Sequence, residues 1–197
     1  MSNILVIKSS LNGNQGQSNI LAQTLVSKLA TEAPVNIVER DLAQNTLPHL
    51  TQPEMTAWMT EAKDRTQEQA DLAAISDNLI DELKLSDTLV IAMPMYNFGI
   101  PSTFKAWIDR VARAGVTFRY TETEPVGLME NKKAIVLAAR GGIYQDTAHD
   151  SQTQYLKDVL AFIGITDVTF IYAEGLNMPG REQRFAAAEK EIDGIAL

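Results

Sequence analysis

The feature that most constrains the fold of this chain is an alternation of short β-rich runs with longer helical patterns. Five runs rich in valine, isoleucine and leucine have the length and composition of buried strands. They are Ile4–Ile7, Val35–Val38, Thr88–Ala92, Ala134–Ala138 and Val168–Tyr172. Because a helical pattern follows each run, consecutive strands can lie parallel in one sheet with helices on both faces. The sequence therefore predicts an α/β fold.

The spacing of apolar residues places the helices between these runs. Leucines recur at every fourth position from Leu21 to Leu29, and apolar residues at 104, 107, 108 and 111 follow the spacing of an amphipathic helix. Further helices are expected at about 64–84, 151–163 and 181–195. The chain has 197 residues and no internal repeat or linker, so a single domain over residues 1–197 is predicted.

Charge and composition exclude several classes of function. A formal net charge of −8 opposes general binding to nucleic acid and to anionic membranes. The absence of cysteine excludes disulfides, thiolate metal sites, cysteine-held iron–sulfur clusters and a cysteine nucleophile. The only histidines, His49 and His149, lie far apart in the sequence, so no metal site is expected. No window reaches the roughly 18 apolar residues of a membrane span and no signal-like segment opens the chain, so the cytoplasm is the expected location.

The third run ends at Pro94, which cannot donate a hydrogen bond to a sheet. The chain must leave the sheet there, and the next four residues are Met95, Tyr96, Asn97 and Phe98. They place backbone amides, a carboxamide and two aromatic rings at the carboxyl end of a strand, where open α/β sheets bind ligands. This tip suits a flat cofactor that forms hydrogen bonds.

The loop after the first run is small, polar and rich in hydroxyl and amide groups. It contains Ser10, Gly16, Gln17 and Ser18 and leads into a helix, whose N-terminal amides and dipole attract a phosphate. The alternative is that Ser18 only caps the helix and the glycines only form a turn. The spacing matches neither the G-x-x-x-x-G-K-[ST] loop of nucleotide triphosphatases nor the G-x-G-x-x-G loop of dinucleotide-binding proteins.

The fourth run leads into Ala139-Arg140-Gly141-Gly142. Two successive glycines let the backbone approach a ring edge more closely than residues with a Cβ allow. Amide donors placed at the pyrimidine rim of a flavin favour its reduced form, because that rim gains negative charge on reduction. The alternative is a plain glycine turn, but three polar loops are predicted to converge at one sheet edge.

The stretch from Asp41 to about Asp64 has no clear periodicity although it contains prolines, methionines and Trp58. A loop of this length in a compact domain is usually functional or locally ordered. We interpret it as a lid or an interface segment.

Several motifs together closely resemble the bacterial FMN-dependent NADH-azoreductases, which also reduce quinones. The resemblance covers essentially the whole chain, and the Met-Tyr-Asn-Phe and Arg-Ala-Gly-Val-Thr-Phe-Arg-Tyr blocks are its most specific parts. The motifs are Lys8-Ser9-Ser10, Gln17-Ser18-Asn19, Pro94 to Phe98, Ala112 to Tyr120, Arg140-Gly141-Gly142 and Phe162-Ile163-Gly164-Ile165.

The resemblance implies a flavodoxin-like, three-layer fold with strand order 2-1-3-4-5, in a homodimer with one FMN per subunit at the subunit boundary. It implies that Ser10 and Gly16 to Ser18 surround the phosphate, while Met95 to Phe98 and Ala139 to Gly142 surround the ring system. Tyr120 and Phe162 match positions that line the substrate space, with contributions from the partner subunit.

The resemblance also implies a ping-pong reaction, in which NADH gives a hydride to the flavin and an aromatic acceptor then takes two electrons. Quinones and azo compounds are the expected acceptors, and Asn97 is the best single polar candidate for orienting flavin and substrate. Two alternatives remain open. One is a one-electron carrier of the flavodoxin type, and the other is an FMN-binding module without turnover.

Overall fold

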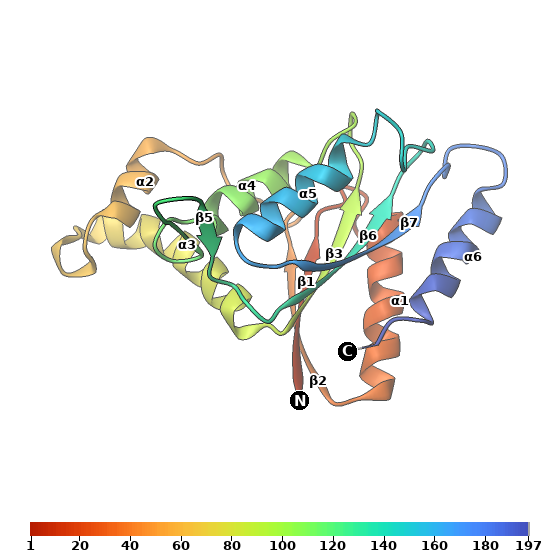
Figure 1. Cartoon of the computed structure of the whole chain (residues 1–197), viewed down its shortest axis with the longest axis horizontal. Helices are drawn as coiled ribbons and strands as arrows, with labels where there is room; N and C mark the ends of the chain where they lie inside the picture. The colour runs from red at the N-terminus through yellow and green to blue at the C-terminus, as the bar shows by residue number, and fades with distance from the viewer. Residues whose placement is uncertain (197) are drawn as a thin grey trace.

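The computed structural model describes residues 1–196, and a parallel five-stranded sheet lies at its centre (Figure 1). The strand order is β2-β1-β3-β6-β7, which confirms the predicted order 2-1-3-4-5 because β6 and β7 are the fourth and fifth strands of this sheet. The strands are β1 Ser2–Lys8, β2 Val35–Asp41, β3 Thr88–Pro94, β6 Lys133–Ala139 and β7 Asp167–Ala173. Pro94 is the last residue of β3, as its missing donor predicts.

Helices cover both faces of the sheet. Helices α1 (Gln17–Glu32) and α6 (Arg181–Ile192) pack on one face, and α3 (Gln67–Leu85), α4 (Ser102–Val111) and α5 (Ser151–Phe162) pack on the other. Because successive side chains of a strand point to opposite faces, Ile4 and Val6 of β1 belong to the core under α1, while Leu5 and Ile7 belong to the core under α3 and α4. The predicted helices are confirmed, with ends shifted by a few residues.

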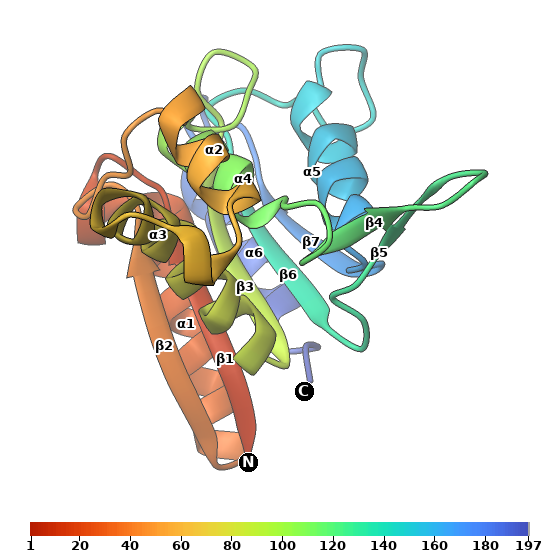
Figure 2. The ribbon, with the colours of Figure 1, turned by 90° about the vertical axis from the view of Figure 1, so that its left-hand side faces the viewer.

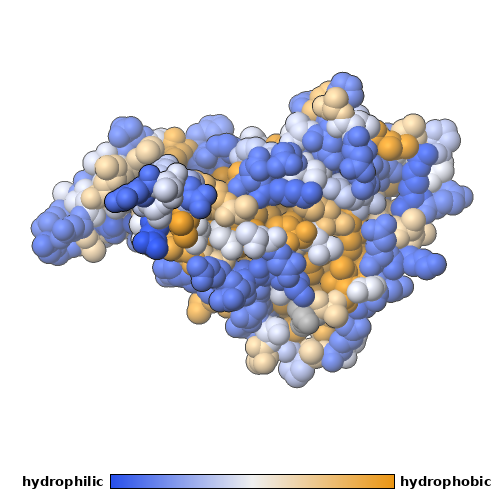
Figure 3. All heavy atoms as spheres, in the orientation of Figure 1, coloured by the Kyte–Doolittle hydropathy of each residue, from blue (hydrophilic) through white to orange (hydrophobic). Residues whose placement is uncertain are grey.

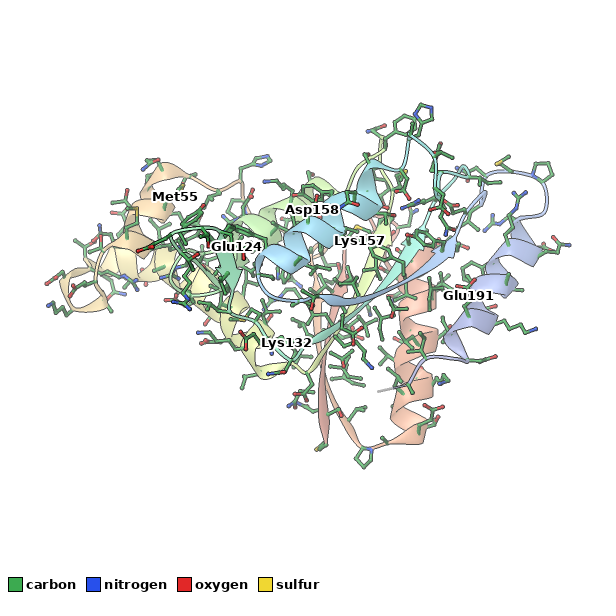
Figure 4. All side chains as sticks on the ribbon, viewed as in Figure 1. Met55, Glu124, Lys132, Lys157, Asp158 and Glu191 are labelled. Carbon is green, nitrogen blue, oxygen red and sulfur yellow. The ribbon has the colours of Figure 1, made fainter. Side chains whose placement is uncertain are left out.

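The two edge strands are less covered than the sequence predicts. The prediction that Val35–Val38 is a buried strand is wrong in its burial, because Ile37 and Val38 of β2 are 38% and 41% exposed. On the opposite edge, Val168 and Phe170 of β7 are partly buried, and Figure 3 shows an apolar area there below α5. Lys157 of α5 lies over this strand in Figure 4, with its Nζ 5.7 Å from the centroid of the Phe170 ring.

The segment from Asp41 to Asp64 is more regular than predicted. It contains helix α2 (Gln52–Met59), with Pro53 in the first turn, and the 3-10 turn η2 (Ala62–Asp64). The segment is therefore locally ordered, and a helix of eight residues is too short to display a clear apolar period in the sequence. Its interpretation as a lid or an interface segment stays a prediction. Helix α2 packs against α3, and its Glu54 is buried in an ion pair with Arg110 of α4.

The structure also contains a second, two-stranded sheet that the sequence did not predict. Phe118 and Tyr120 belong to β4 (Phe118–Tyr120), which pairs antiparallel with β5 (Pro125–Gly127). Figure 2 shows this hairpin projecting away from the central sheet beside α5. At its base, a Cβ on Gly127 would overlap the backbone nitrogen of Gly164, so this crossing requires glycine. Strands of three residues carry too little alternation to be recognised in a sequence.

Candidate functional site

The three loops singled out in the sequence meet at the carboxyl edge of the sheet. The hydroxyl of Ser9 donates to the carbonyl of Ala92 at 3.0 Å and so joins the ends of β1 and β3. The N–H of Leu11 donates to Tyr96 Oη at 3.0 Å, and the N–H of Met95 donates to the carbonyl of Ala139 at 3.1 Å. The predicted convergence of these loops is thereby confirmed.

A crevice of about 490 Å³ lies between the loops that follow β3, β6 and β7. Its volume lies within the range that small-molecule sites occupy. The residues that line it are Met95, Asn97, Phe98, Gly141, Gly142, Tyr144 and Asn177. Five of these seven are residues that the sequence predicted to contact a cofactor.

The tip after β3 is a tight turn with an unusual backbone. Tyr96 and Gly99 exchange two N–H···O bonds of 3.0 Å, and between them Asn97 and Phe98 have φ angles of 51° and 65°. Two central residues with positive φ are typical of a type I′ turn. Phenylalanine rarely adopts this region, and such strain clusters at functional sites.

Gln152, near the start of α5, supports this turn from below. Its Nε2 donates to the carbonyls of Pro94 and Gly99 at 2.9 and 3.2 Å, and the Ser151 hydroxyl donates to the carbonyl of Phe98. The strained tip is therefore held at three of its carbonyl groups.

The predicted phosphate loop surrounds the N-terminus of α1. Gly16 is the N-cap residue, and no side chain caps this helix end. The hydroxyl of Ser18 is buried and has no hydrogen-bond partner within residues 1–196, so the alternative that Ser18 caps the helix is wrong. A Cβ on Gly16 would overlap Ser10 Oγ, which shows how closely the loop packs here. Gln17 Oε1 accepts a hydrogen bond from Arg181 at 3.3 Å.

The structure separates the side chain of Arg140 from the two glycines that follow it. Gly141 and Gly142 line the crevice. The side chain of Arg140 does not, because its guanidinium is fully buried among Glu174, Asp150 and Thr153. Only the backbone of Arg140 therefore remains near the predicted cofactor.

Two residues of the crevice were missed in the sequence. Tyr144 follows the two glycines, and its ring lies 5.4 Å from the ring of Phe98 in an edge-to-face arrangement. Asn177 lies in the loop after β7, and its N–H donates to the carbonyl of Gly141 at 3.0 Å. The signal for Asn177 was its position after the fifth strand, which ends at the same edge as the others.

Tyr120 and Phe162 do not reach the crevice of their own chain. Phe162 is the last residue of α5, and Ser151, the first residue, contacts the strained tip. The length of the helix therefore places Phe162 about 17 Å from Ser151. Phe118 joins the two aromatic residues in one cluster, with ring centroids 4.1 Å from Phe162 and 5.5 Å from Tyr120. Tyr120 is 72% exposed.

A second, mostly apolar hollow of about 490 Å³ lies between α4 and α5 on the other side of the tip. Lys105, Asp109 and Tyr155 line it together with Gly99 and Ile100. Burial raises the pKa of the Tyr155 phenol, so this side chain stays neutral at physiological pH. Among residues 1–196 there is neither a helix long and apolar enough to cross a membrane nor a group of three or more metal-ligating side chains.

Known proteins resemble this chain over almost its whole length. A family described by its flavodoxin-like fold matches residues 2–195. A protein of Alteromonas mediterranea named FMN-dependent NADH:quinone oxidoreductase is 55% identical over 195 residues, which cover 98% of this chain and 97% of that protein. A protein of the same name from Cellvibrio japonicus is 49% identical over 194 residues, covering 98% of each.

Solved structures of azoreductases also resemble this chain over almost its whole length. An azoreductase from Bacillus anthracis is 28% identical and covers 98% of both chains, with a TM-score of 0.89. An FMN-dependent NADH-azoreductase from the same species, in complex with FMN, is 25% identical with a TM-score of 0.89, and the match covers 98% of this chain and 97% of that one.

Proposed function

The chain belongs to the flavodoxin-like family and, within it, to the FMN-dependent NADH:quinone oxidoreductases, and from this membership we propose which of its residues hold FMN and the substrates. In this proposal, the phosphate of FMN lies at the N-terminus of α1, against Ser10, Gly16, Gln17 and Ser18. Its ring system lies in the crevice along residues 95–98 and 139–142. The residues present fit such a group on both counts.

The N-terminus of α1 fits a phosphate. No side chain caps this end of a 16-residue helix, so its first amides and the positive end of its dipole are available to an anion. The buried hydroxyl of Ser18 has no partner among the described residues, and burying a hydroxyl without a hydrogen bond costs about 1–3 kcal/mol. A phosphate oxygen satisfies it. This orphaned hydroxyl is the observation that carries the proposal.

The crevice fits a flat ring system. Gly141 and Gly142 line it, and their carbonyls accept hydrogen bonds from the N–H groups of Asn177 and Gly175. Their own N–H groups donate to no acceptor within residues 1–196. Asn97 stands on the opposite loop with its carboxamide exposed to the crevice. Donors therefore face the space from two sides.

When bound, FMN supplies the two-electron chemistry that connects NADH to an acceptor. The protein binds and orients. The strained turn fixes Asn97 before any ligand arrives, so its carboxamide needs little reorganisation to orient flavin and substrate. We assign no acid–base residue, because a reduced quinone or amine can take its protons from water.

We propose quinones and aromatic azo compounds as the acceptors. Both are planar, and both can stack where the nicotinamide of NADH has stood, as a ping-pong reaction requires. Cleaving an azo bond to two amines consumes four electrons and hence two cycles, whereas reducing a quinone consumes two electrons and one cycle. Quinones are therefore expected to be at least as good as azo dyes.

We further propose that the enzyme acts as a cytoplasmic homodimer in which each subunit completes the other's site. Tyr120 and Phe162 lie a helix length from the crevice of their own chain, so they can line a substrate space only across a subunit boundary. The apolar hollow between α4 and α5 offers surface for such a boundary. Asn97→Ala and Tyr120→Ala subunits should each be impaired alone, and mixing them should raise activity because each mixed dimer contains one intact site. A monomer in solution, or a mixture no more active than the average of the two variants, would contradict this.

The central test is a titration of the apoprotein with FMN, followed by addition of NADH and a simple quinone. We expect one FMN per chain and catalytic NADH oxidation. Binding without NADH oxidation would favour a non-catalytic module or a one-electron carrier, which needs a separate reductase. No binding would remove the proposed site.

A further inference from the structure

Arg140, which precedes the two glycines of the crevice, is the centre of a buried charged cluster. Nη1 of Arg140 donates to Glu174 Oε1 at 3.0 Å, and Nη2 donates to Asp150 Oδ1 and to Thr153 Oγ1, both at 2.9 Å. The guanidinium is fully buried, and the two carboxylate side chains are at most 10% exposed. One guanidinium thus joins the end of β6, the end of β7 and the start of α5.

Glu174 extends this cluster to the loop that lines the crevice. Its Oε1 also accepts the N–H groups of Tyr144 and Gln145, both at 3.0 Å. Asp150 in turn caps α5 by accepting the N–H of Thr153 at 3.1 Å. The loop after Gly142 is therefore fastened at both of its ends to the charges that surround Arg140.

The segment held in this way lines the crevice. The carbonyls of Arg140, Gly141 and Gly142 accept bonds of 3.1, 3.0 and 2.8 Å from the loop after β7. The N–H groups of the two glycines have no acceptor among residues 1–196, so they are the polar atoms left for a ligand. Donors fixed in this way stabilise developing negative charge without reorganisation.

We propose that Arg140, Glu174 and Asp150 form a positioning cluster that sets both the affinity for FMN and its reduction potential, although none of their side chains contacts the cofactor. This rests on the proposed FMN site. The cluster holds the glycine amides in place, and its one guanidinium against two carboxylates leaves one net negative charge behind the ring. In a poorly solvated site that charge opposes reduction of the flavin.

The two effects have opposite signs, which makes them separable. Glu174→Gln removes a negative charge but keeps an oxygen that can accept the Tyr144 and Gln145 amides, and Asp150→Asn likewise removes a negative charge. Each should favour reduction, by up to about tenfold in the equilibrium constant, or about 30 mV for two electrons. Arg140→Lys keeps the charge but loses the forked geometry. It should weaken FMN binding about tenfold with a smaller shift in potential.

The experiment measures the FMN dissociation constant by fluorescence quenching and the midpoint potential of the loaded protein. Arg110→Lys is the matched control, because Arg110 is an equally buried, carboxylate-paired arginine that lies away from the crevice. It should lower stability and leave both FMN properties unchanged. A cluster that only supports the fold would lower the potential in every variant, since loosened amides favour the oxidised flavin.

An unchanged or lowered potential in Glu174→Gln and Asp150→Asn would therefore overturn the inference, as would Arg140→Lys binding FMN as tightly as the unaltered protein. These outcomes differ from a failure of the proposed function, in which the unaltered apoprotein itself binds no FMN.

Discussion

Glu54 and Arg110 form a buried, two-pronged ion pair, with Arg110 Nε 2.7 Å from Glu54 Oε1 and Nη2 2.8 Å from Oε2. The third nitrogen of the guanidinium donates to the carbonyls of Pro48 and Ala106. The pair therefore fixes α2 and the chain before it to α4, in a segment whose sequence shows no regular pattern.

Removing one partner of this pair should be costly. Glu54→Ala leaves a fully buried guanidinium without its counter-charge, and we expect the free energy of unfolding to fall by about 3–5 kcal/mol. Glu61→Ala is the comparison, because Glu61 pairs with Lys63 on the surface and should contribute less than about 1 kcal/mol. Denaturant titration of both variants measures the difference, and equal losses would contradict the role of the pair.

Ser18→Ala should separate folding from cofactor binding. Because the buried hydroxyl has no partner in the chain, its removal should leave the apoprotein as stable or more stable. The same change should weaken FMN binding by about 10- to 100-fold, since it deletes a charge-assisted hydrogen bond to phosphate. Ser76→Ala is the control. The Ser76 hydroxyl donates to the carbonyl of Arg110 at 2.6 Å, so that variant should lose stability and keep its FMN affinity.

Asn97 combines a strained backbone with a carboxamide, and two substitutions distinguish them. Asn97→Gly relieves the positive φ, whereas Asn97→Ala retains it and costs stability of the order of 1 kcal/mol. Both remove the carboxamide, so both should slow flavin reduction by NADH in stopped-flow measurements or loosen FMN. Unchanged reduction and affinity in both variants would show that the side chain has no part in the site.

Gly141→Val should exclude the ring system from the crevice. A Cβ at this position already overlaps the side-chain nitrogen of Asn177, so the valine should destabilise the loop as well. Adding Asn177→Ala relieves the clash within the protein but leaves the valine in the crevice. The double variant should regain stability without regaining FMN. If it purifies with a full complement of FMN, the glycine does not approach the ring.

Asp150 should make the protein sensitive to acid. Burial alone would raise the pKa of its carboxyl, but hydrogen bonds from Arg140 and Thr153 outweigh burial and hold the pKa below its ordinary value of 3.8. The carboxylate therefore stabilises the fold above the unfolded-state pKa, and this contribution is lost as the pH falls toward the lower folded-state pKa. Between about pH 5 and pH 3, the unaltered protein should lose more stability than Asp150→Asn. Parallel losses would contradict the shift.

The central sheet was predictable because its strands and helices are long enough to show their periods. The predicted strands at Ile4–Ile7 and Thr88–Ala92 lie within β1 and β3, and the order 2-1-3-4-5 is confirmed. The exposure of Ile37 and Val38 was not predictable, because a strand's place at the edge of a sheet depends on which strands pair with it and not on its own residues.

The lining of the crevice was predictable where one short motif supplies it, as at Met95–Phe98 and Gly141–Gly142, whereas the role of these residues in binding stays a prediction. The buried role of the Arg140 side chain was not, because Glu174 and Asp150 come from other parts of the chain and only the fold brings them together. Helix α2 and the small hairpin were missed because eight and three residues are too few to reveal a period.

In the dimer that we propose, the close approach of Gly127 and Gly164 at the base of the hairpin affects how the subunits meet. A Cβ on Gly127 would overlap the backbone of Gly164, so the two main chains pack closely at the base of the hairpin that carries Tyr120. An arm that is already rigid in the separate subunit loses little conformational freedom when a neighbour receives it. If the proposed dimer forms in this way, substituting either glycine should weaken association of the subunits before it affects the central sheet.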